Sequence, residues 1–180
     1  LTSGLTILDG TVGAGGHSQL ILSALNQSGQ LIGFDRDPMM LAIAEQTLLP
    51  NQNTNCQLVR SSYAEAAVVL PTLGVTGVDR VLLDLGLSSD QLSDRQRGFG
   101  FDAGGPLDMR YHPAEGRSAA EILRSFDEAQ LEEIFTTYGE DPASRKIATE
   151  IVRRRKLGHP VTTAEELESC VRDAVGHARN

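Results

Sequence analysis

The residues with the clearest chemical potential form a short segment near the amino terminus, Asp9-Gly-Thr-Val-Gly-Ala-Gly-Gly-His17. Gly13, Gly15 and Gly16 leave the backbone uncovered, because glycine lacks a β-carbon and tolerates positive φ. If a helix follows the turn, its first amide groups would face an anionic or polar ligand. A glycine-rich turn can also be only a tight connection between two elements, so the segment needs support from other residues.

Two carboxylates narrow the class of ligand. Asp35 follows the glycine turn by about 20 residues, where an acidic side chain can accept hydrogen bonds from ribose hydroxyls. Asp9 would repel the pyrophosphate of a dinucleotide, but it suits a cofactor that carries an ammonium group and a cationic sulfur. S-adenosylmethionine has both groups. The alternative for Asp9 is a carboxylate that caps the turn.

These residues need a strand before the turn and a helix after it. Residues 5–9 are an apolar run, and residues 17–25 have apolar side chains at helical spacing. Further strands are predicted over 30–35, 56–60 and 78–84, the last of them buried. Helices are predicted over 65–70 and from the Asp37-Pro38 cap to Pro50. This alternation predicts an α/β fold, a Rossmann-like parallel sheet with helices on both faces.

The second half of the chain has a different pattern. Residues 90–117 are rich in turn-forming and charged residues, which predicts a long structured loop, and such loops are usually functional. Helices are predicted over 119–126, 127–138 and 143–157, with a fourth after Thr162. Thr163 and Glu166 have capping-box spacing. We therefore predict two domains: a core over 1–89, and a loop with a helical insertion over 90–180.

Composition excludes several classes of protein. The formal net charge of −8 argues against a protein that coats nucleic acid nonspecifically, although basic residues concentrate in the second half. No apolar run is long enough to span a membrane and no signal peptide is evident, so a cytoplasmic location is expected. Cys56 and Cys170 have no partner spacing, which predicts packing roles rather than a disulfide, and no metal site is predicted.

The ordered motifs resemble a known family. They are Asp-Gly-Thr-Val-Gly-Ala-Gly-Gly-His-Ser at 9–18, Gly-Phe-Asp-Arg-Asp-Pro at 33–38, Leu-Leu-Asp-Leu-Gly-Leu-Ser-Ser at 82–89, Arg-Gly-Phe-Gly-Phe at 97–101 and Gly-Pro-Leu-Asp-Met-Arg at 105–110. Together with Tyr-Gly-Glu at 138–140 and Arg-Lys-Ile-Ala at 145–148, they are similar to the MraW-type methyltransferases. That resemblance implies transfer of a methyl group from S-adenosylmethionine to the exocyclic N4 amine of a cytosine in 16S ribosomal RNA. It also implies small-subunit RNA, or the assembling 30S subunit, as the partner.

The resemblance assigns roles by position. Together with the residues argued above, it predicts a cofactor-binding set of Asp9, Gly13, Gly15, Gly16, His17, Asp35, Tyr63, Asp84 and Gln91. An aromatic ring at position 63 could pack on adenine. Hydrogen-bond acceptors near the amine are predicted at Asp84, Ser88 and Ser89, which are the candidate catalytic residues. Asp84 could instead cap the loop, and the serines could be turn formers.

Two basic groups are predicted to meet RNA. Arg95, Arg97 and Arg110 lie in sequence near Phe99, Phe101 and Tyr111, and single-stranded RNA is held by cations and by aromatic stacking. Arg153, Arg154 and Arg155 lie on a predicted amphipathic helix. Burial of the aromatic rings and a solvated helix face are the alternatives.

The pattern also departs from that of the family. Family members are considerably longer, so we expect segment 81–84 to be an exposed sheet edge unless another chain covers it, and a homodimer could form through this edge or through the insertion domain. One alternative function is therefore a truncated, catalytically incompetent domain that binds cofactor or self-associates. An NAD-dependent oxidoreductase is a second alternative, favoured by the glycine turn and disfavoured by Asp9 and by the motifs from Asp84 to Arg110.

Overall fold

The chain folds as two compact units, Leu1–Ser88 and Ser89–Asn180. The computed structural model describes residues 4–25, 28–48, 55–100 and 105–176. The division falls one residue before the boundary predicted from the sequence. Each unit has its own apolar core, one built on a sheet and one on helices.

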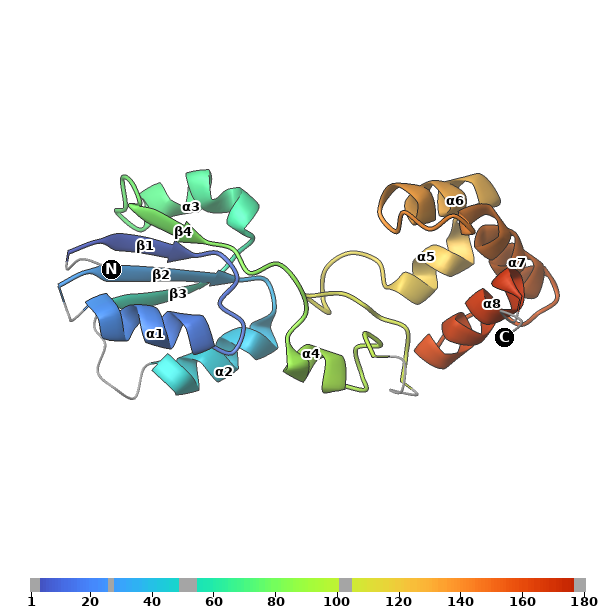
Figure 1. Cartoon of the computed structure of the whole chain (residues 1–180), viewed down its shortest axis with the longest axis horizontal. Helices are drawn as coiled ribbons and strands as arrows, with labels where there is room; N and C mark the ends of the chain where they lie inside the picture. The colour runs from blue at the N-terminus through green and yellow to red at the C-terminus, as the bar shows by residue number, and fades with distance from the viewer. Residues whose placement is uncertain (1–3, 26–27, 49–54, 101–104, 177–180) are drawn as a thin grey trace. The chain divides into compact units, whose positions relative to one another are not determined.

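The first unit contains a parallel four-stranded sheet in the order β3-β2-β1-β4. Its strands are β1 (Thr6–Asp9), β2 (Gln30–Asp35), β3 (Cys56–Arg60) and β4 (Arg80–Leu82). Helices α1 (Gly16–Leu25) and α2 (Pro38–Leu48) lie on one face, and α3 (Ala66–Thr72) lies on the other (Figure 1). A 3-10 turn, η2 (Tyr63–Glu65), precedes α3. The prediction of a Rossmann-like α/β sheet with helices on both faces is confirmed.

Neighbouring apolar residues of each strand pack on opposite faces of the sheet. Ile7 and Leu31 belong to a buried cluster with α1 and α2, whereas Leu8 and Ile32 belong to a second cluster with Leu70 of α3. Successive side chains of a strand point to opposite faces, so neighbouring apolar residues supply both layers. This explains why the strands read as continuous apolar runs in the sequence.

The strand order places a switch point beside β1. The chain runs outward from β1 to β3, then returns through α3 to β4 on the opposite side of β1. In open α/β sheets, ligands bind outside the carboxyl ends of the strands at such a point. Asp9 and Asp35 are the last residues of β1 and β2. The segment that follows Leu82 leaves β4 at the same side of the sheet, where the carboxyl ends of the strands lie.

Strand β4 is the exposed edge that the sequence predicted, but it is not the buried strand expected over 78–84. It spans only Arg80–Leu82, and among the described strands it pairs with β1 alone. Val81 is 56% exposed and Leu83 is 44% exposed. Apolar side chains on this strand stay accessible because no strand lies beyond it among the described residues.

The second unit is helical. After the short helix α4 (Ser89–Ser93) and an irregular segment, it comprises α5 (Ala119–Ser125), α6 (Glu128–Thr137), α7 (Ser144–Lys156) and α8 (Ala164–Val175). The capping box of Thr163 and Glu166 is confirmed, and Cys170 is fully buried in the core. Among the described residues, no helix is both long and apolar enough to cross a membrane.

We predict that Gly33→Ala destabilises the first unit by about 1–3 kcal/mol, because a β-carbon there would lie 2.5 Å from Val12 Cγ2 and 2.7 Å from Leu58 Cδ2. Gly77→Ala is the matched control, since a β-carbon at Gly77 meets no atom within 4 Å. Chemical denaturation would measure both. Equal stabilities of the two variants would contradict this account of the packing.

Candidate functional site

The glycine turn is fastened to the end of β2 by a carboxylate. Asp35 Oδ2 accepts a hydrogen bond from the Gly13 amide at 2.8 Å, and Asp35 Oδ1 accepts one from the Asp37 amide at 2.9 Å. Gly13 and Gly15 have φ values of 54° and 91°, which side-chain-bearing residues rarely adopt. The turn therefore needs both its glycines and the partner that sequence spacing had placed about 20 residues later.

The outward side of this turn is open. A β-carbon built on Gly13 or on Gly16 would meet no atom within 4 Å, whereas one on Gly15 would lie 3.2 Å from Leu48 Cγ. Gly15 thus packs against α2, while Gly13 and Gly16 present bare backbone. Such a surface accepts a ligand in close contact with the chain.

Asp9 points into the protein rather than toward that surface. Its carboxylate is fully buried and accepts hydrogen bonds from Ser18 Oγ at 2.7 Å and from the Thr11 amide at 3.1 Å. This is the turn-capping arrangement that the sequence left open as an alternative. Asp9 therefore shapes the loop and orients the start of α1, and its predicted contact with a cofactor remains a prediction.

Burial raises the pKa of Asp35 above its ordinary value, and the backbone amides of Asp37 and Gly13 oppose that rise. A protonated carboxyl group is favoured by desolvation, whereas hydrogen bonds donated to the carboxylate favour its ionised form. The amides of Gly13 and Asp37 thus offset part of the desolvation cost of a charged Asp35 at the carboxyl end of β2.

Thr11 joins the glycine turn to the loop that follows β4. Its hydroxyl oxygen accepts a hydrogen bond from the Asp84 amide at 2.7 Å, and the Gly10 amide donates to the Leu82 carbonyl oxygen at 2.9 Å. Sequence analysis missed Thr11 because its neighbours carried the motif. The signal was present, since Thr11 carries a hydroxyl group within the turn that directly follows β1.

Asp84 and His17 lie on the accessible side of the same region. Asp84 Oδ2 is 3.7 Å from His17 Nδ1, and both side chains are more than half exposed. The predicted site residues Asp84 and His17 are therefore brought together. A carboxylate in this position can accept a hydrogen bond from a ligand at the carboxyl ends of β1 and β4.

Tyr63 is placed by a well-defined turn. The Ser62 hydroxyl and the Glu65 carboxylate form a reciprocal cap around η2, so the first turn of that element is fixed. A β-carbon on Gly10 would lie 2.9 Å from Tyr63 Cβ and 2.5 Å from Leu83 Cδ2. Gly10 therefore allows Tyr63 to approach the loop closely, while Tyr63 itself stays 43% exposed.

The remaining predicted site residues fall on both sides of the boundary between the units. The Ser88 hydroxyl donates to Met40 Sδ at 3.2 Å within the first unit. Ser89 and Gln91 belong to α4 in the second unit, where Gln91 is buried. The roles of Ser88 and Ser89 as hydrogen-bond acceptors near the substrate amine, and of Gln91 in cofactor binding, remain predictions.

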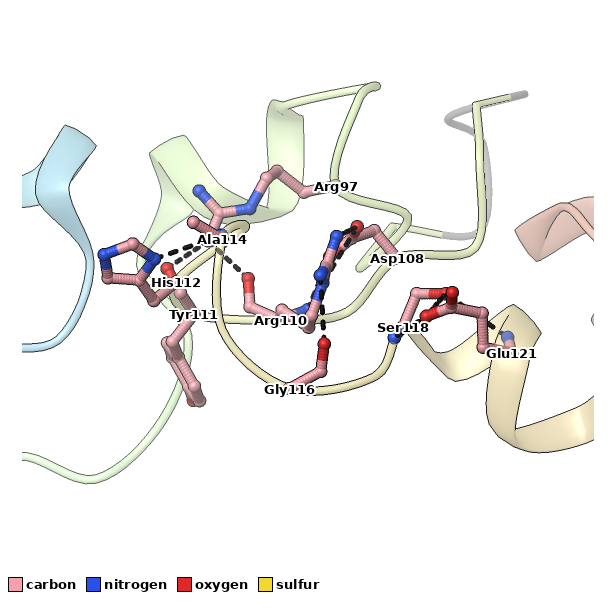
Figure 2. Close-up of polar contacts among 9 residues, drawn as sticks. All are labelled: Arg97, Asp108, Arg110, Tyr111, His112, Ala114, Gly116, Ser118 and Glu121. Carbon is pink, nitrogen blue, oxygen red and sulfur yellow. Dashed lines mark hydrogen bonds and ion pairs between the residues drawn. The ribbon is translucent and has the colours of Figure 1, made fainter. Parts of the chain in front are cut away.

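Arg97 is a structural residue, which corrects the expectation that it meets RNA phosphates. It is 5% exposed, and its Nη2 donates to the carbonyl oxygens of Arg110 and Tyr111 at 2.7 and 2.8 Å (Figure 2). Arg110 is held by the Asp108 carboxylate, with Nη2 and Oδ2 2.5 Å apart. Arg95 is exposed, and Phe101 lies outside the described residues.

The arginines of α7 are also largely engaged within the protein. Arg155 Nη1 donates to the carbonyl oxygens of Leu123, Arg124 and Phe126 at the end of α5, which gives Arg155 a structural role, and its predicted phosphate contact remains a prediction. Arg153 and Arg154 both pair with Glu150, and Arg154 also reaches Asp173. Hydrogen bonds from Arg153 and Arg154 lower the pKa of Glu150 to about 2.

We predict that Thr11→Val destabilises the first unit by about 1 kcal/mol and speeds hydrogen exchange of the Asp84 amide, because valine removes the acceptor and keeps the shape. Thr11→Ser retains the hydroxyl and is expected to retain slow exchange. Unchanged protection of the Asp84 amide in the valine variant would contradict the proposed connection.

Comparison with known proteins agrees with this geometry. Curated relatives, each called ribosomal RNA small subunit methyltransferase H, occur in Chromobacterium violaceum, at 46% identity over 160 residues, and in Nitrosomonas eutropha, at 46% over 164 residues. These alignments cover 89% and 91% of this chain, and 49% and 50% of the relatives. The chain thus spans about half the length of the curated relatives it matches. Residues 2–180 match the MraW methylase family, and the chain belongs to that family.

Proposed function

We propose that this chain is the cofactor-binding part of an S-adenosylmethionine-dependent methyltransferase that modifies the N4 amine of a cytosine in small-subunit ribosomal RNA. The observation that carries the proposal is the open glycine turn, which Asp35 fastens to β2 and Thr11 joins to the Asp84 loop. Membership of the MraW methylase family supports the same reaction. A cytoplasmic location follows from the proposed substrate.

The residues at the switch point suit this cofactor. Gly13 and Gly16 offer bare backbone for close approach, Asp35 has lone pairs for ribose hydroxyls, and the exposed Tyr63 ring offers a face to adenine. When bound, the cofactor supplies a methyl group on a positively charged sulfur. Asp9 contributes by fixing the turn from inside, and it does not need to touch the cofactor to do so.

Asp84 is the group best placed to act on the amine that accepts the methyl group. A cytosine exocyclic nitrogen is a weak nucleophile because its lone pair is delocalised into the ring. An acceptor near its N–H bonds localises that pair and directs it toward the methyl carbon. Thr11 holds the backbone of Asp84, which places its carboxylate at the carboxyl ends of β1 and β4. Alignment of an acceptor amine with a methyl donor can give effective molarities of roughly 10⁵ M or more.

RNA contacts are proposed for the cations that stay accessible. Arg95 and Arg153 are exposed, and Arg110 is partly accessible although it is paired with Asp108. The Arg154 side chain is only 18% exposed and pairs with two acidic residues, so we propose that it contributes less to RNA binding. The proposed partner is small-subunit RNA, alone or in the assembling 30S particle.

We predict that the chain binds S-adenosylhomocysteine, the demethylated cofactor, and that Asp35→Ala weakens binding at least about tenfold, because a hydrogen bond to a charged group is lost and the turn is released. Asp79→Ala is the matched control. Its carboxylate also accepts a backbone amide, that of Thr6, but at the opposite ends of the strands. Isothermal titration calorimetry would measure both variants.

The same titration separates the alternatives. Binding of NAD without S-adenosylhomocysteine would favour an oxidoreductase and sink the proposal. Cofactor binding without methyl transfer to small-subunit RNA would favour the other alternative, a domain that binds cofactor but is catalytically incompetent. Equal affinities of the wild-type and Asp35→Ala proteins would remove Asp35 from the site.

We propose further that two copies of the chain associate through the edge of β4, where Val81 and the two leucines that follow it at positions 83 and 85 are exposed. A strand edge with unpaired backbone groups invites pairing, and a lysine on it opposes pairing. Val81→Lys is expected to lower the dimer fraction in sedimentation equilibrium. Leu20→Lys, on exposed α1, should leave it unchanged. A wild-type chain that stays monomeric at all concentrations would contradict this proposal.

A further inference from the structure

The segment 106–111 of the second unit is fixed from several directions. Arg97 Nη2 holds the carbonyl oxygens of Arg110 and Tyr111, and the Met109 amide donates to the Arg97 carbonyl oxygen at 2.8 Å (Figure 2). The Leu107 amide donates to the Thr162 carbonyl oxygen at 2.8 Å. A buried arginine and a strand-like contact thus hold a stretch that has no regular secondary structure.

This fixation forces an unfavourable backbone. Met109 has a φ of 59°, in the left-handed region that a residue with a side chain rarely adopts. Gly98, with a φ of 68°, passes so close that a β-carbon on it would lie 2.4 Å from the Pro106 carbonyl oxygen. Strain that the surrounding structure maintains is typical of sites that hold a ligand.

The side chains that this backbone presents are apolar and accessible. Met109 is 43% exposed and Tyr111 is 38% exposed. The part of each side chain that stays in water adds nothing to hydrophobic stabilisation and is available to a ligand. Figure 2 shows the Tyr111 side chain directed away from the ion pair between Arg110 and Asp108.

The Tyr111 ring is also oriented in advance. Its centroid lies 5.8 Å from that of Phe99 with an interplanar angle of 45°, and the Arg97 guanidinium carbon lies 5.6 Å from the Phe99 centroid. The cation therefore packs on Phe99, and Phe99 in turn contacts the Tyr111 ring and restricts its orientation. A ligand that stacks on it would lose little affinity to immobilising the side chain.

Cationic side chains lie on the chain that flanks the ring. Arg110 Nη1 donates to the Gly116 carbonyl oxygen at 3.2 Å, whereas the neighbouring Arg117 is directed to the end of α5, where it donates to Ser125 Oγ at 3.3 Å and lies over the Phe126 ring. Arg95 is exposed two residues before Arg97. An accessible aromatic ring flanked by cations suits a nucleobase whose backbone is anionic.

We propose that Tyr111, supported by Phe99, stacks on a base of the single-stranded RNA substrate, with Met109 packing against the same base and Arg95 meeting a neighbouring phosphate. The proposal rests on the proposed function and names a contact within it. Because single-stranded RNA exposes unstacked bases and a duplex does not, the site should prefer the single strand.

Binding of a fluorescent single-stranded RNA oligonucleotide of about ten nucleotides, followed by anisotropy, tests the contact. Tyr111→Leu should weaken binding about fivefold or more, whereas Tyr111→Phe keeps the ring face and should bind like the wild type. Tyr138→Leu is the matched control, since Tyr138 is 83% exposed in the same unit. Thermal midpoints of the variants would show that each is folded.

A second measurement does not depend on the stability of the leucine variant. The chain contains no tryptophan, so Tyr111→Trp introduces a single indole whose emission should be quenched when a base stacks on it. Tyr138→Trp should show no such quenching. The same oligonucleotide annealed to its complement should quench the emission of the Tyr111→Trp protein much less.

Two results would overturn the proposal: equal RNA affinities of the leucine and phenylalanine variants, or indole emission that RNA leaves unchanged. Titration with S-adenosylhomocysteine separates this failure from that of the proposed function. A chain that binds S-adenosylhomocysteine but shows no effect at Tyr111 retains the proposed function and loses the stacking site. A chain that binds neither S-adenosylhomocysteine nor RNA loses both.

Discussion

The first unit depends on a carboxylate that is buried where the central strand ends. Asp9 has no exposed surface, so each of its oxygens needs a donor within the protein. Ser18 and the Thr11 amide supply them, and in doing so they fix the first turn of α1 and the backbone of the glycine loop. Thr11 is then oriented to accept the Asp84 amide. The cofactor turn and the acceptor loop therefore share one internal support.

Periodicity predicted most elements of this fold, although it overestimated the length and burial of β4 and did not indicate α4. The apolar runs that became β1 and β2 and the cap that begins α8 were evident because local spacing determines them. The direction of the Asp9 side chain could not be predicted, since a carboxylate at the end of a strand can face a ligand or the protein interior. Only the position of Ser18 in three dimensions decides between the two, and sequence spacing does not supply it.

Arginine was the least predictable residue of the second unit, and the cause is chemical. A guanidinium group has five donors, and both phosphate and backbone carbonyl oxygens accept them. Arg97 and Arg155 meet carbonyl groups that lie up to 32 positions away along the chain, so no local pattern could distinguish their roles from that of Arg95. The number of arginines in the second unit therefore overestimates how many guanidinium groups are available to bind RNA phosphates.

The loop that follows β4 and carries Asp84 is held on one side only, and this affects cofactor binding and methyl transfer differently. Toward β1, Gly10 and Thr11 hold the loop by hydrogen bonds. Toward the outer edge, no described strand pairs with β4, and Val81 on that strand is exposed. The cofactor turn lies on the supported side, whereas the position of the acceptor carboxylate depends on both. Cofactor binding and methyl transfer should therefore be separable properties, with binding the less sensitive of the two to what covers β4.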